Sequence, residues 1–355
     1  QHLRLNRFLG WGTDVNPISE KELSLFDDLL KEIRPDIMGI SSRSMHLGLT
    51  RDVANRVRRQ MPKATLIAGG YGPTIDPVSF LEACDWVILG EGDEAFITFL
   101  NSTDPRKAPN VAYMQNGKLR CNPVLKPVDL DALPFPDWDT DNKYMIEDDQ
   151  LKRGSDFYDQ RTYDIFASRG CISSCSYCLA CQWTRMLKRY GVTFPKIRFR
   201  SPQSVIDELI YAKEKYGIDF VRFKDSIFAI NEKWLGEFIG LYEKHIGLRL
   251  NCLLDERFVD EKRVRLLCNV GLHDTTVGIQ SANEDIRRNV FNRQISDDGV
   301  IKYAQMLTRN NIEIKYDLIN WNPFETEETL DQGRGFLKRL PKSTEISTTQ
   351  LMMFP

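Results

Sequence analysis

The sequence has no long apolar run and almost no net charge. No stretch of its 355 residues approaches the roughly eighteen apolar residues that a membrane span needs, so we expect no transmembrane segment. The 48 Lys and Arg residues are balanced by 50 Asp and Glu residues, and a net charge of -2 provides no global field for nucleic acid. The first ten residues lack the apolar core of an export signal. We therefore expect a cytoplasmic globular protein, of a length that favours two domains.

Two nucleotide-binding fingerprints are also missing, G-x-G-x-x-G and G-x-x-x-x-G-K-[ST]. What the sequence does contain is a tight group of cysteines, since four of the eight fall within eleven residues. Secreted disulfide frameworks spread their cysteines over distant loops, so this group indicates a metal or iron–sulfur site. We interpret Cys84, Cys252 and Cys268, which lie in apolar or helical stretches, as small buried side chains.

The first part of the chain has the pattern of an α/β domain. Strand-length apolar runs at 36–42, 64–70 and 86–90 alternate with helical patterns at 19–34, 50–61 and 78–84. Strands that are apolar throughout and separated by helices predict an open parallel, Rossmann-like sheet, which we assign to residues 1–121.

Ligands of such sheets lie beyond the carboxyl ends of the strands. The loops there are rich in glycine and hydroxyl groups, which lets a backbone approach a bulky ligand closely. Tight turns that bind nothing are the alternative for any single loop. The candidate ligand-binding residues are Ser41, Ser42, Gly69, Gly70, Tyr71, Gly72, Pro73, Thr74, Gly90, Glu91 and Gly92.

Residues 122–157 are rich in proline and aspartate, which predicts an inter-domain linker. Strand and helix patterns alternate again over 158–355. Six βα-type repeats predict a curved parallel sheet, a partial (β/α)6 barrel with its function at the carboxyl ends of the strands. The expected strands are 163–168, 220–224, 248–254, 274–279, 313–319 and 345–353, and the expected helices are 204–216, 232–244, 261–269, 297–310 and 327–338.

The cysteine group follows the first of these strands with the spacing C-x3-C-x2-C-x2-C. Structural zinc sites use two cysteine pairs usually a dozen or more residues apart, and the ferredoxin pattern puts its three-residue gap last. A closed zinc or electron-transfer site nevertheless stays open as an alternative. C-x3-C-x2-C after a strand, with an aromatic residue before the third cysteine, resembles the radical S-adenosylmethionine (radical SAM) superfamily. That resemblance implies a 4Fe-4S cluster held by Cys171, Cys175 and Cys178, with a fourth iron left for SAM. Cys181 is additional: it could cap that iron, take part in chemistry or pack nearby, and we favour a residue that is not a ligand.

The same resemblance extends to the later strand ends. It implies SAM contacts from Tyr177, Asp225, Arg257, Gln280, Ser281 and Glu325. Gln280 replaces the glutamate of the family's G-[IV]-E-S ribose motif, and residues 320–322 depart from the glycine expected beside adenine.

The first domain and the linker complete the resemblance. G-G-x-x-P-T at 69–74, G-E-G-[DE] at 90–93 and L-P-x-P in the linker resemble the cobalamin-binding, class B methyltransferase-like subgroup of radical SAM enzymes. This implies cobalamin at the rim of the first sheet. The D-x-H-x-x-G signature of histidine-ligated cobalamin is absent, and we interpret His46 as a surface histidine. The usual first strand of a cobalamin domain is not evident before Ser19 and the chain ends at the sixth barrel strand, so we expect further segments at both ends.

By resemblance, we expect a radical SAM C-methyltransferase. It would cleave SAM reductively to a 5′-deoxyadenosyl radical and methylate an unactivated carbon of a small-molecule or peptide substrate. An external one-electron donor such as flavodoxin or ferredoxin would supply the electron. Two alternatives remain, namely a cobalamin-dependent oxidation, cyclisation or ring rearrangement without methyl transfer, and a non-catalytic iron–sulfur and corrinoid carrier.

Overall fold

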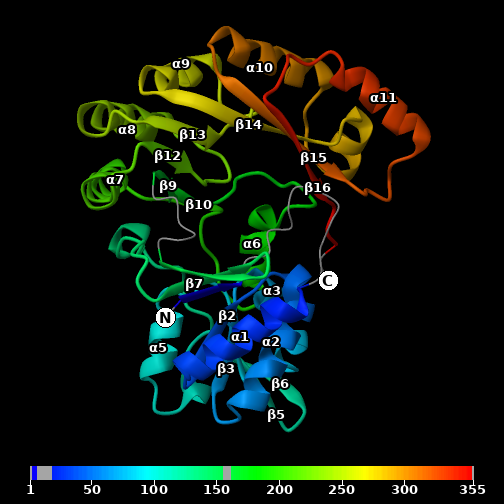
Figure 1. The fold of residues 1–355 in the computed structure, drawn as a ribbon. Coiled ribbons are helices and arrows are strands. Elements are labelled where there is room, and N and C mark those ends of the chain that lie inside the picture. Colours follow the sequence, from blue (N-terminus) through cyan, green and yellow to red (C-terminus); the bar gives the residue numbers. More distant parts are fainter. Residues whose placement is uncertain (1, 6–17, 155–160, 354–355) are drawn as a thin grey trace.

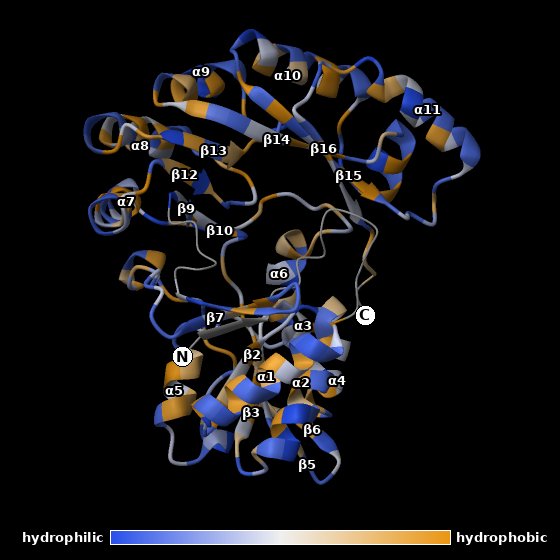
Figure 2. Cartoon of the chain, in the orientation of Figure 1, coloured by the Kyte–Doolittle hydropathy of each residue, from blue (hydrophilic) through white to orange (hydrophobic). Residues whose placement is uncertain are grey.

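The computed structural model describes residues 2–5, 18–154 and 161–353 of the chain. Figure 1 shows two α/β layers at opposite ends of the molecule, with helix α6 (Leu179–Lys188) between them. Figure 2 shows helices with both blue and orange faces, as expected for amphipathic helices that cover a sheet. Among these residues, no helix combines the length and the apolar character needed to cross a membrane.

The first sheet has the strand order β2-β3-β4-β5-β6. Its first three strands are parallel, which confirms the predicted fold, and β5 and β6 add an antiparallel hairpin that we did not predict. The strands are β2 (Ile37–Ser41), β3 (Thr65–Gly69), β4 (Trp86–Ile88), β5 (Val111–Gln115) and β6 (Lys118–Cys121). The helices are α1 (Glu20–Ile33), α2 (Leu47–Gln60), α3 (Tyr71–Ile75), α4 (Pro77–Leu81) and α5 (Ala95–Asn101), with 3-10 turns at Ser44–His46 and Pro105–Lys107. The predicted start of α1 is correct, since Ser19 and Glu22 form a reciprocal capping box.

The proline-rich segment contains regular structure near its end. After a 3-10 turn at Leu130–Ala132, β7 (Lys143–Glu147) and β8 (Gln150–Arg153) form a hairpin, and β1 (His2–Leu5) pairs parallel to β7. The side chain of Ile146 is buried in the core of the first domain, and Arg153 forms a two-pronged ion pair with Glu32 of α1 at 2.8 and 2.6 Å. The hairpin therefore packs as part of the first domain.

The second sheet is entirely parallel and has the order β16-β15-β14-β13-β12-β9, which confirms the partial barrel. Its strands are β9 (Thr162–Ile165), β12 (Phe220–Phe223), β13 (Arg249–Leu253), β14 (Leu272–Gln280), β15 (Glu313–Asn320) and β16 (Glu345–Gln350). The helices outside it are α7 (Pro202–Tyr216), α8 (Glu232–His245), α9 (Glu261–Asn269), α10 (Asp297–Arg309) and α11 (Glu327–Leu337), with a π-helical turn at Ile286–Val290. An antiparallel pair, β10 (Ser168–Gly170) and β11 (Ile197–Phe199), leaves the barrel after β9.

The barrel core is apolar and close-packed around aromatic rings. Phe228, Phe238 and Trp234 contact one another, and Phe223 contacts Phe228 and Phe238. The rings of Trp234 and Phe238 stack at 5.1 Å between centroids. Such pairs contribute about 0.5–1.5 kcal/mol each beyond area burial. This core gives the strand ends a rigid base.

Candidate active site

The cysteine loop lies between β10 and α6, on the side of the barrel that faces the first domain (Figure 1). Cys171, Cys175 and Cys181 are buried, whereas Cys178 is half-buried and precedes the first residue of α6. Cys181, in the first turn of α6, lies next to the thiols of the other three cysteines. All four cysteines therefore converge at the start of one helix.

Hydrogen bonding from Cys181 lowers the pKa of Cys171, Cys175 and Cys178, against the opposing effect of burial. The proximity of the other three thiols raises the pKa of Cys181. Thiolates, not thiols, bind iron, and a lowered pKa at Cys171, Cys175 and Cys178 suits that role. The donor chemistry thus fits a cluster held by three sulfurs. Among the described residues, no three His, Cys, Asp or Glu side chains are already arranged around a single metal ion.

A segment far along the chain covers this loop. Ser176 donates its backbone N–H to the carbonyl of Phe291 at 3.0 Å and its hydroxyl to that of Val290 at 2.6 Å. The amide of Asn292 donates to the carbonyl of Ser174 at 2.9 Å, and the ring of Tyr177 meets Phe291 edge-on at 5.0 Å. Residues 290–292 therefore fix the conformation of the loop.

Two arginines and one aspartate lie beside Cys175. Arg257 donates to both carboxylate oxygens of Asp255, at 2.9 and 2.7 Å, and to the hydroxyl of Ser173 at 3.0 Å. Its Nη2 is 4.0 Å from the sulfur of Cys175. Arg293 donates to Asp255 at 3.1 Å, and the charges of both arginines help lower the pKa of Cys175 after hydrogen bonding from Cys181. Arg257 is among the predicted SAM residues, whereas Arg293 is not, because it follows no strand end.

The buried carboxylate of Asp225 contacts the strand that leads into the loop. It accepts hydrogen bonds from the backbone N–H of Ala167 at 3.0 Å and from the hydroxyl of Ser168 at 2.5 Å. Burial raises its pKa to about 6, although these hydrogen bonds oppose the shift. Asp225, Arg257 and Tyr177 are thus gathered around the cysteine loop.

The other predicted SAM residues form a second group at the ends of β14 and β15. Gln280 has a positive φ of 70° at an irregularity in the β14–β15 ladder, and Ser281 is 1% exposed. Burial raises the pKa of Glu325, and a hydrogen bond with Ser281 partly offsets this effect. Trp321 stands where the family pattern departs from glycine, with a φ of 59° in the left-handed region and a 70% exposed side chain.

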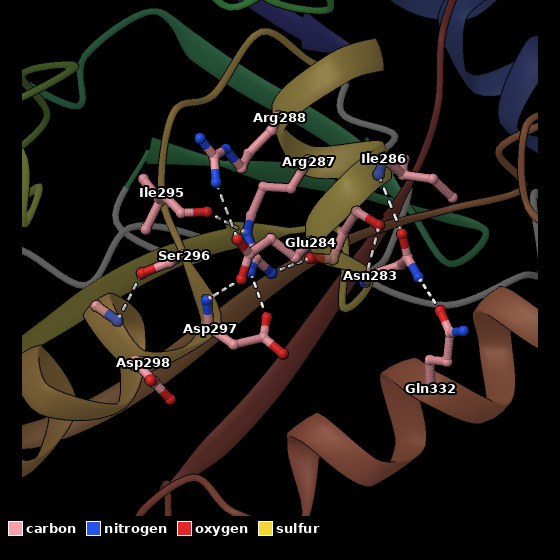
Figure 3. Close-up of polar contacts among 12 residues, drawn as sticks. Asn283, Glu284, Ile286, Arg287, Arg288, Ile295, Ser296, Asp297, Asp298 and Gln332 are labelled. Atoms are coloured by element: carbon pink, nitrogen blue, oxygen red, sulfur yellow. Dashed lines mark hydrogen bonds and ion pairs between the residues drawn. The ribbon is translucent and has the colours of Figure 1, made fainter.

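A buried arginine supports this second group (Figure 3). Arg287 is fully buried and donates to the carbonyl of Ser281 at 2.7 Å and to Asp297 at 2.5 Å, with its guanidinium 5.1 Å from the ring centre of Phe336. Asn283 bonds Gln332 of α11 at 2.7 Å. These contacts, which we did not predict, join the turn after β14 to α10 and α11.

The rim of the first domain is built by loops packed on one another. Gly70 has a φ of 99°, and a Cβ on Gly72 would lie 2.6 Å from the backbone of Arg43, so both positions need glycine for packing within the rim. Thr74 donates to the carbonyl of Gly70 at 2.8 Å and accepts from the N–H of Gly90 at 3.0 Å. Of the predicted cobalamin residues, Ser41 and Tyr71 are exposed, and a Cβ on Gly92 would have no neighbour within 4 Å. The exposed side chain of Ser41 and the free space at Gly92 leave part of the rim uncovered.

Helix α6 rests on this rim. The rings of Tyr71 and Trp183 meet edge-on at 4.7 Å, and Tyr190 donates to the carbonyl of Thr74 at 3.0 Å. Glu91, a predicted cobalamin residue, accepts hydrogen bonds from Arg169 and Arg198 of the second domain. The helix that begins at the cysteine loop therefore ends against the rim. His46 is half-buried in a 3-10 turn beside that rim.

Comparison with known families agrees with this architecture. A B12-binding domain model matches residues 12–100, and a radical SAM superfamily model matches residues 165–334. The chain belongs to the cobalamin-binding radical SAM family. These matches confirm the predicted family and its cofactor classes, cobalamin for the first domain and a 4Fe-4S cluster with SAM for the second. They lie within the predicted domains 1–121 and 158–355, whose boundaries stay a prediction.

Relatives of this radical SAM protein include methyltransferases. It is 24% identical over 322 residues to an uncharacterized methyltransferase of Pyrococcus horikoshii, covering 88% of this chain and 66% of the relative. It is 23% identical over 344 residues to the cobalamin-dependent radical SAM methyltransferase TokK of Streptomyces tokunonensis, covering 91% and 48%. The structure of the methyltransferase TsrM from Kitasatospora setae, with cobalamin and a [4Fe-4S] cluster bound, has the same fold at a TM-score of 0.70 and 16% identity, covering 97% and 74%. The chain thus spans between about half and two thirds of the length of these two curated relatives.

Proposed function

We propose that this chain is a cobalamin-dependent radical SAM C-methyltransferase that cleaves SAM reductively and methylates an unactivated carbon. The observation that carries the proposal is the packing of the cysteine loop, through α6, against the rim of the B12-binding domain. A methyl donor and a radical generator must face one substrate for such a reaction, and this packing brings their two sites together. The methyltransferase relatives support the same reaction class.

In this proposal Cys171, Cys175 and Cys178 hold the cluster, and the rim residues hold cobalamin. When bound, the cluster supplies one electron to SAM, and cobalamin supplies the methyl group. Asp225 receives the SAM amino group and Arg257 the carboxylate, because a carboxylate suits an ammonium and a guanidinium fork suits a carboxylate. Gln280, Ser281 and Glu325 contact the nucleoside. Tyr177 packs beside the loop, and Phe291 against it keeps water away.

The electron is proposed to come from an external donor such as flavodoxin or ferredoxin, and the substrate is proposed to be a small molecule or peptide.

Asp255 neutralises part of the guanidinium charge beside Cys175, so the loop is not left with uncompensated charge.

The test is product analysis on the anaerobically reconstituted chain with cobalamin, SAM, a chemical reductant and a panel of small-molecule and peptide substrates. Methyl transfer consumes SAM to both 5′-deoxyadenosine and S-adenosylhomocysteine. 5′-Deoxyadenosine alone, together with an altered but unmethylated substrate, would instead favour oxidation, cyclisation or rearrangement. Absence of 5′-deoxyadenosine from a preparation with full iron content would favour a non-catalytic carrier. Cys175→Ala, which removes one iron ligand, is the matched control.

A further inference from the structure

Four charged side chains join the two domains beside the cysteine loop. Glu91 and Asp93 follow β4 of the first domain, and Arg169 and Arg198 lie on β10 and β11 of the second. The β10–β11 register pairs Arg169 directly with Arg198. Two like charges opposite each other on neighbouring strands repel, so the pair requires the carboxylates of the other domain.

The distances show how closely these groups interact. Arg169 donates to Asp93 at 2.7 and 3.1 Å, in a two-pronged pair, and to Glu91 at 3.0 Å. Glu91 also accepts from Arg198, and both of these side chains are nearly buried, at 14% and 13% exposed. Burial alone would raise the pKa of Asp93, but hydrogen bonding and charge from Arg169 lower it overall. Partly buried, two-pronged pairs of this kind are stronger and more directional than surface pairs.

Arg169 is connected to the first cysteine by a rigid backbone. Gly170, between Arg169 and Cys171, has a φ of 104°, and a Cβ there would lie 2.1 Å from the carbonyl oxygen of Lys196. That carbonyl accepts the backbone N–H of Cys171 at 3.0 Å. A displacement of Arg169 is therefore passed directly to the loop.

We propose that Arg169, held by Asp93 and Glu91, is a positioning residue that sets the distance and orientation between the cysteine loop and the cobalamin rim. The inference rests on the proposed function, because it matters only if both sites carry their cofactors. Helix α6 makes the other connection between loop and rim, through Trp183 and Tyr190. A single contact between the two domains would let one rotate against the other. Contacts from two different elements, β10 and α6, restrict that rotation.

The test measures geometry without a substrate. The chain is reconstituted with its iron–sulfur cluster and hydroxocobalamin and then reduced so that the cluster and cob(II)alamin are both paramagnetic, and pulsed electron paramagnetic resonance gives the distance distribution between them. We expect a narrow distribution for the wild type and one about twofold broader for Arg169→Met, which keeps the stem of the side chain and removes its charge. Arg153→Met, which breaks the two-pronged pair with Glu32 within the first domain, should match the wild type.

Asp93→Asn tests the same pair from the other domain, so the inference does not depend on the folding of Arg169→Met. Combining Arg169→Asp with Asp93→Arg reverses the pair, and we expect this double variant to narrow the distribution again relative to either single change. An unchanged distribution in Arg169→Met, or in Asp93→Asn if the former does not fold, overturns the inference and leaves the proposed function intact. A wild-type chain that takes up no cluster or no cobalamin overturns the proposed function itself.

Discussion

The charge state of each cysteine is set by its immediate neighbours. Cys181 lies next to the other three thiols, and the guanidinium of Arg257 lies 4.0 Å from the sulfur of Cys175. A fourth cysteine so close to three others can either bind iron itself or remain a protonated thiol beside the cluster. The spacing C-x3-C-x2-C is already complete with Cys171, Cys175 and Cys178, so we expect Cys181 to be the cysteine that does not bind iron.

Replacement of Cys181 should therefore preserve the cluster. We expect Cys181→Ala to retain nearly all of the wild-type iron and sulfide after anaerobic reconstitution, whereas Cys175→Ala loses most of it. Iron and sulfide assays on the desalted proteins make the comparison, with Cys268→Ala outside the loop as a control. Equal losses in Cys181→Ala and Cys175→Ala would make Cys181 a ligand.

The buried carboxylate of Asp225 should make stability depend on pH. Its pKa rises from 3.8 to about 6 in the fold, so its contribution to stability is present below about pH 4 and is lost as the pH rises through about 6. The asparagine of Asp225→Asn cannot ionise at this position. We therefore expect the free energy of unfolding of the wild type, minus that of the variant, to fall by roughly 3 kcal/mol between pH 4 and pH 7.

Urea unfolding of the cofactor-free proteins across that range measures the difference. Asp207→Asn, an exposed carboxylate on α7, is the control. A gap between wild type and Asp225→Asn that stays constant with pH would contradict the expectation.

Among the helices and strands, those with a clear apolar pattern were predicted from the sequence. The barrel strands and their helices are unbroken apolar or amphipathic segments, and they lie close to their predicted positions. The β5–β6 hairpin was missed although Asn116-Gly117 joins its strands with positive φ at both residues, the signature of a tight hairpin turn. The pair β10–β11 gave no comparable signal, because each strand has only three residues and β10 carries no apolar side chain.

Gly170 shows how a short element can depend on one residue. Any side chain there meets the carbonyl of Lys196 and must also adopt a φ of 104°, so we expect Gly170→Ala to lower the free energy of unfolding by about 2–4 kcal/mol and to reduce iron retention. Gly236→Ala is the matched control: this exposed glycine lies within α8 with no neighbour within 4 Å, and alanine there should stabilise by about 0.5–1 kcal/mol. Thermal unfolding and iron analysis compare the two, and similar melting of both variants would disprove the explanation.

The turn after β14 depends on Arg287 in a comparable way. Arg287→Met leaves Asp297 and the carbonyl of Ser281 without a buried partner. We therefore expect the free energy of unfolding to fall by about 3 kcal/mol or more. Arg288→Met, its exposed neighbour paired with Glu284, should change stability by less than about 0.5 kcal/mol. Urea unfolding measures both, and equal effects would argue against a supporting role for Arg287.

At the scale of the whole molecule, contacts between distant segments determine the site. Arg169 and Glu91 are 78 positions apart, and nothing in their local sequences links them. The role of β7 and β8 was hidden for the same reason, because the proline content of 122–157 predicts a linker while the partners of its last strands lie in α1 and the first core.

A fragment that ends at residue 154 should therefore be more stable than one that ends at 121. Burying Ile146 contributes about 1.5–3 kcal/mol, so we expect the longer fragment to unfold at a clearly higher temperature. Ile146→Ala in the longer fragment should remove most of the gain. Identical melting temperatures for fragments 1–121 and 1–154 would place the hairpin outside the domain.

The contact between the cysteine loop and residues 290–292 also bears on how the loop forms during synthesis. Asn292 lies 118 positions after Ser174, so a ribosome adding about 5–20 residues per second needs roughly 6–24 seconds to supply it. During that interval the loop lacks its hydrogen bonds to residues 290–292. We therefore expect the loop to reach its final conformation only after translation has passed the fourth barrel strand.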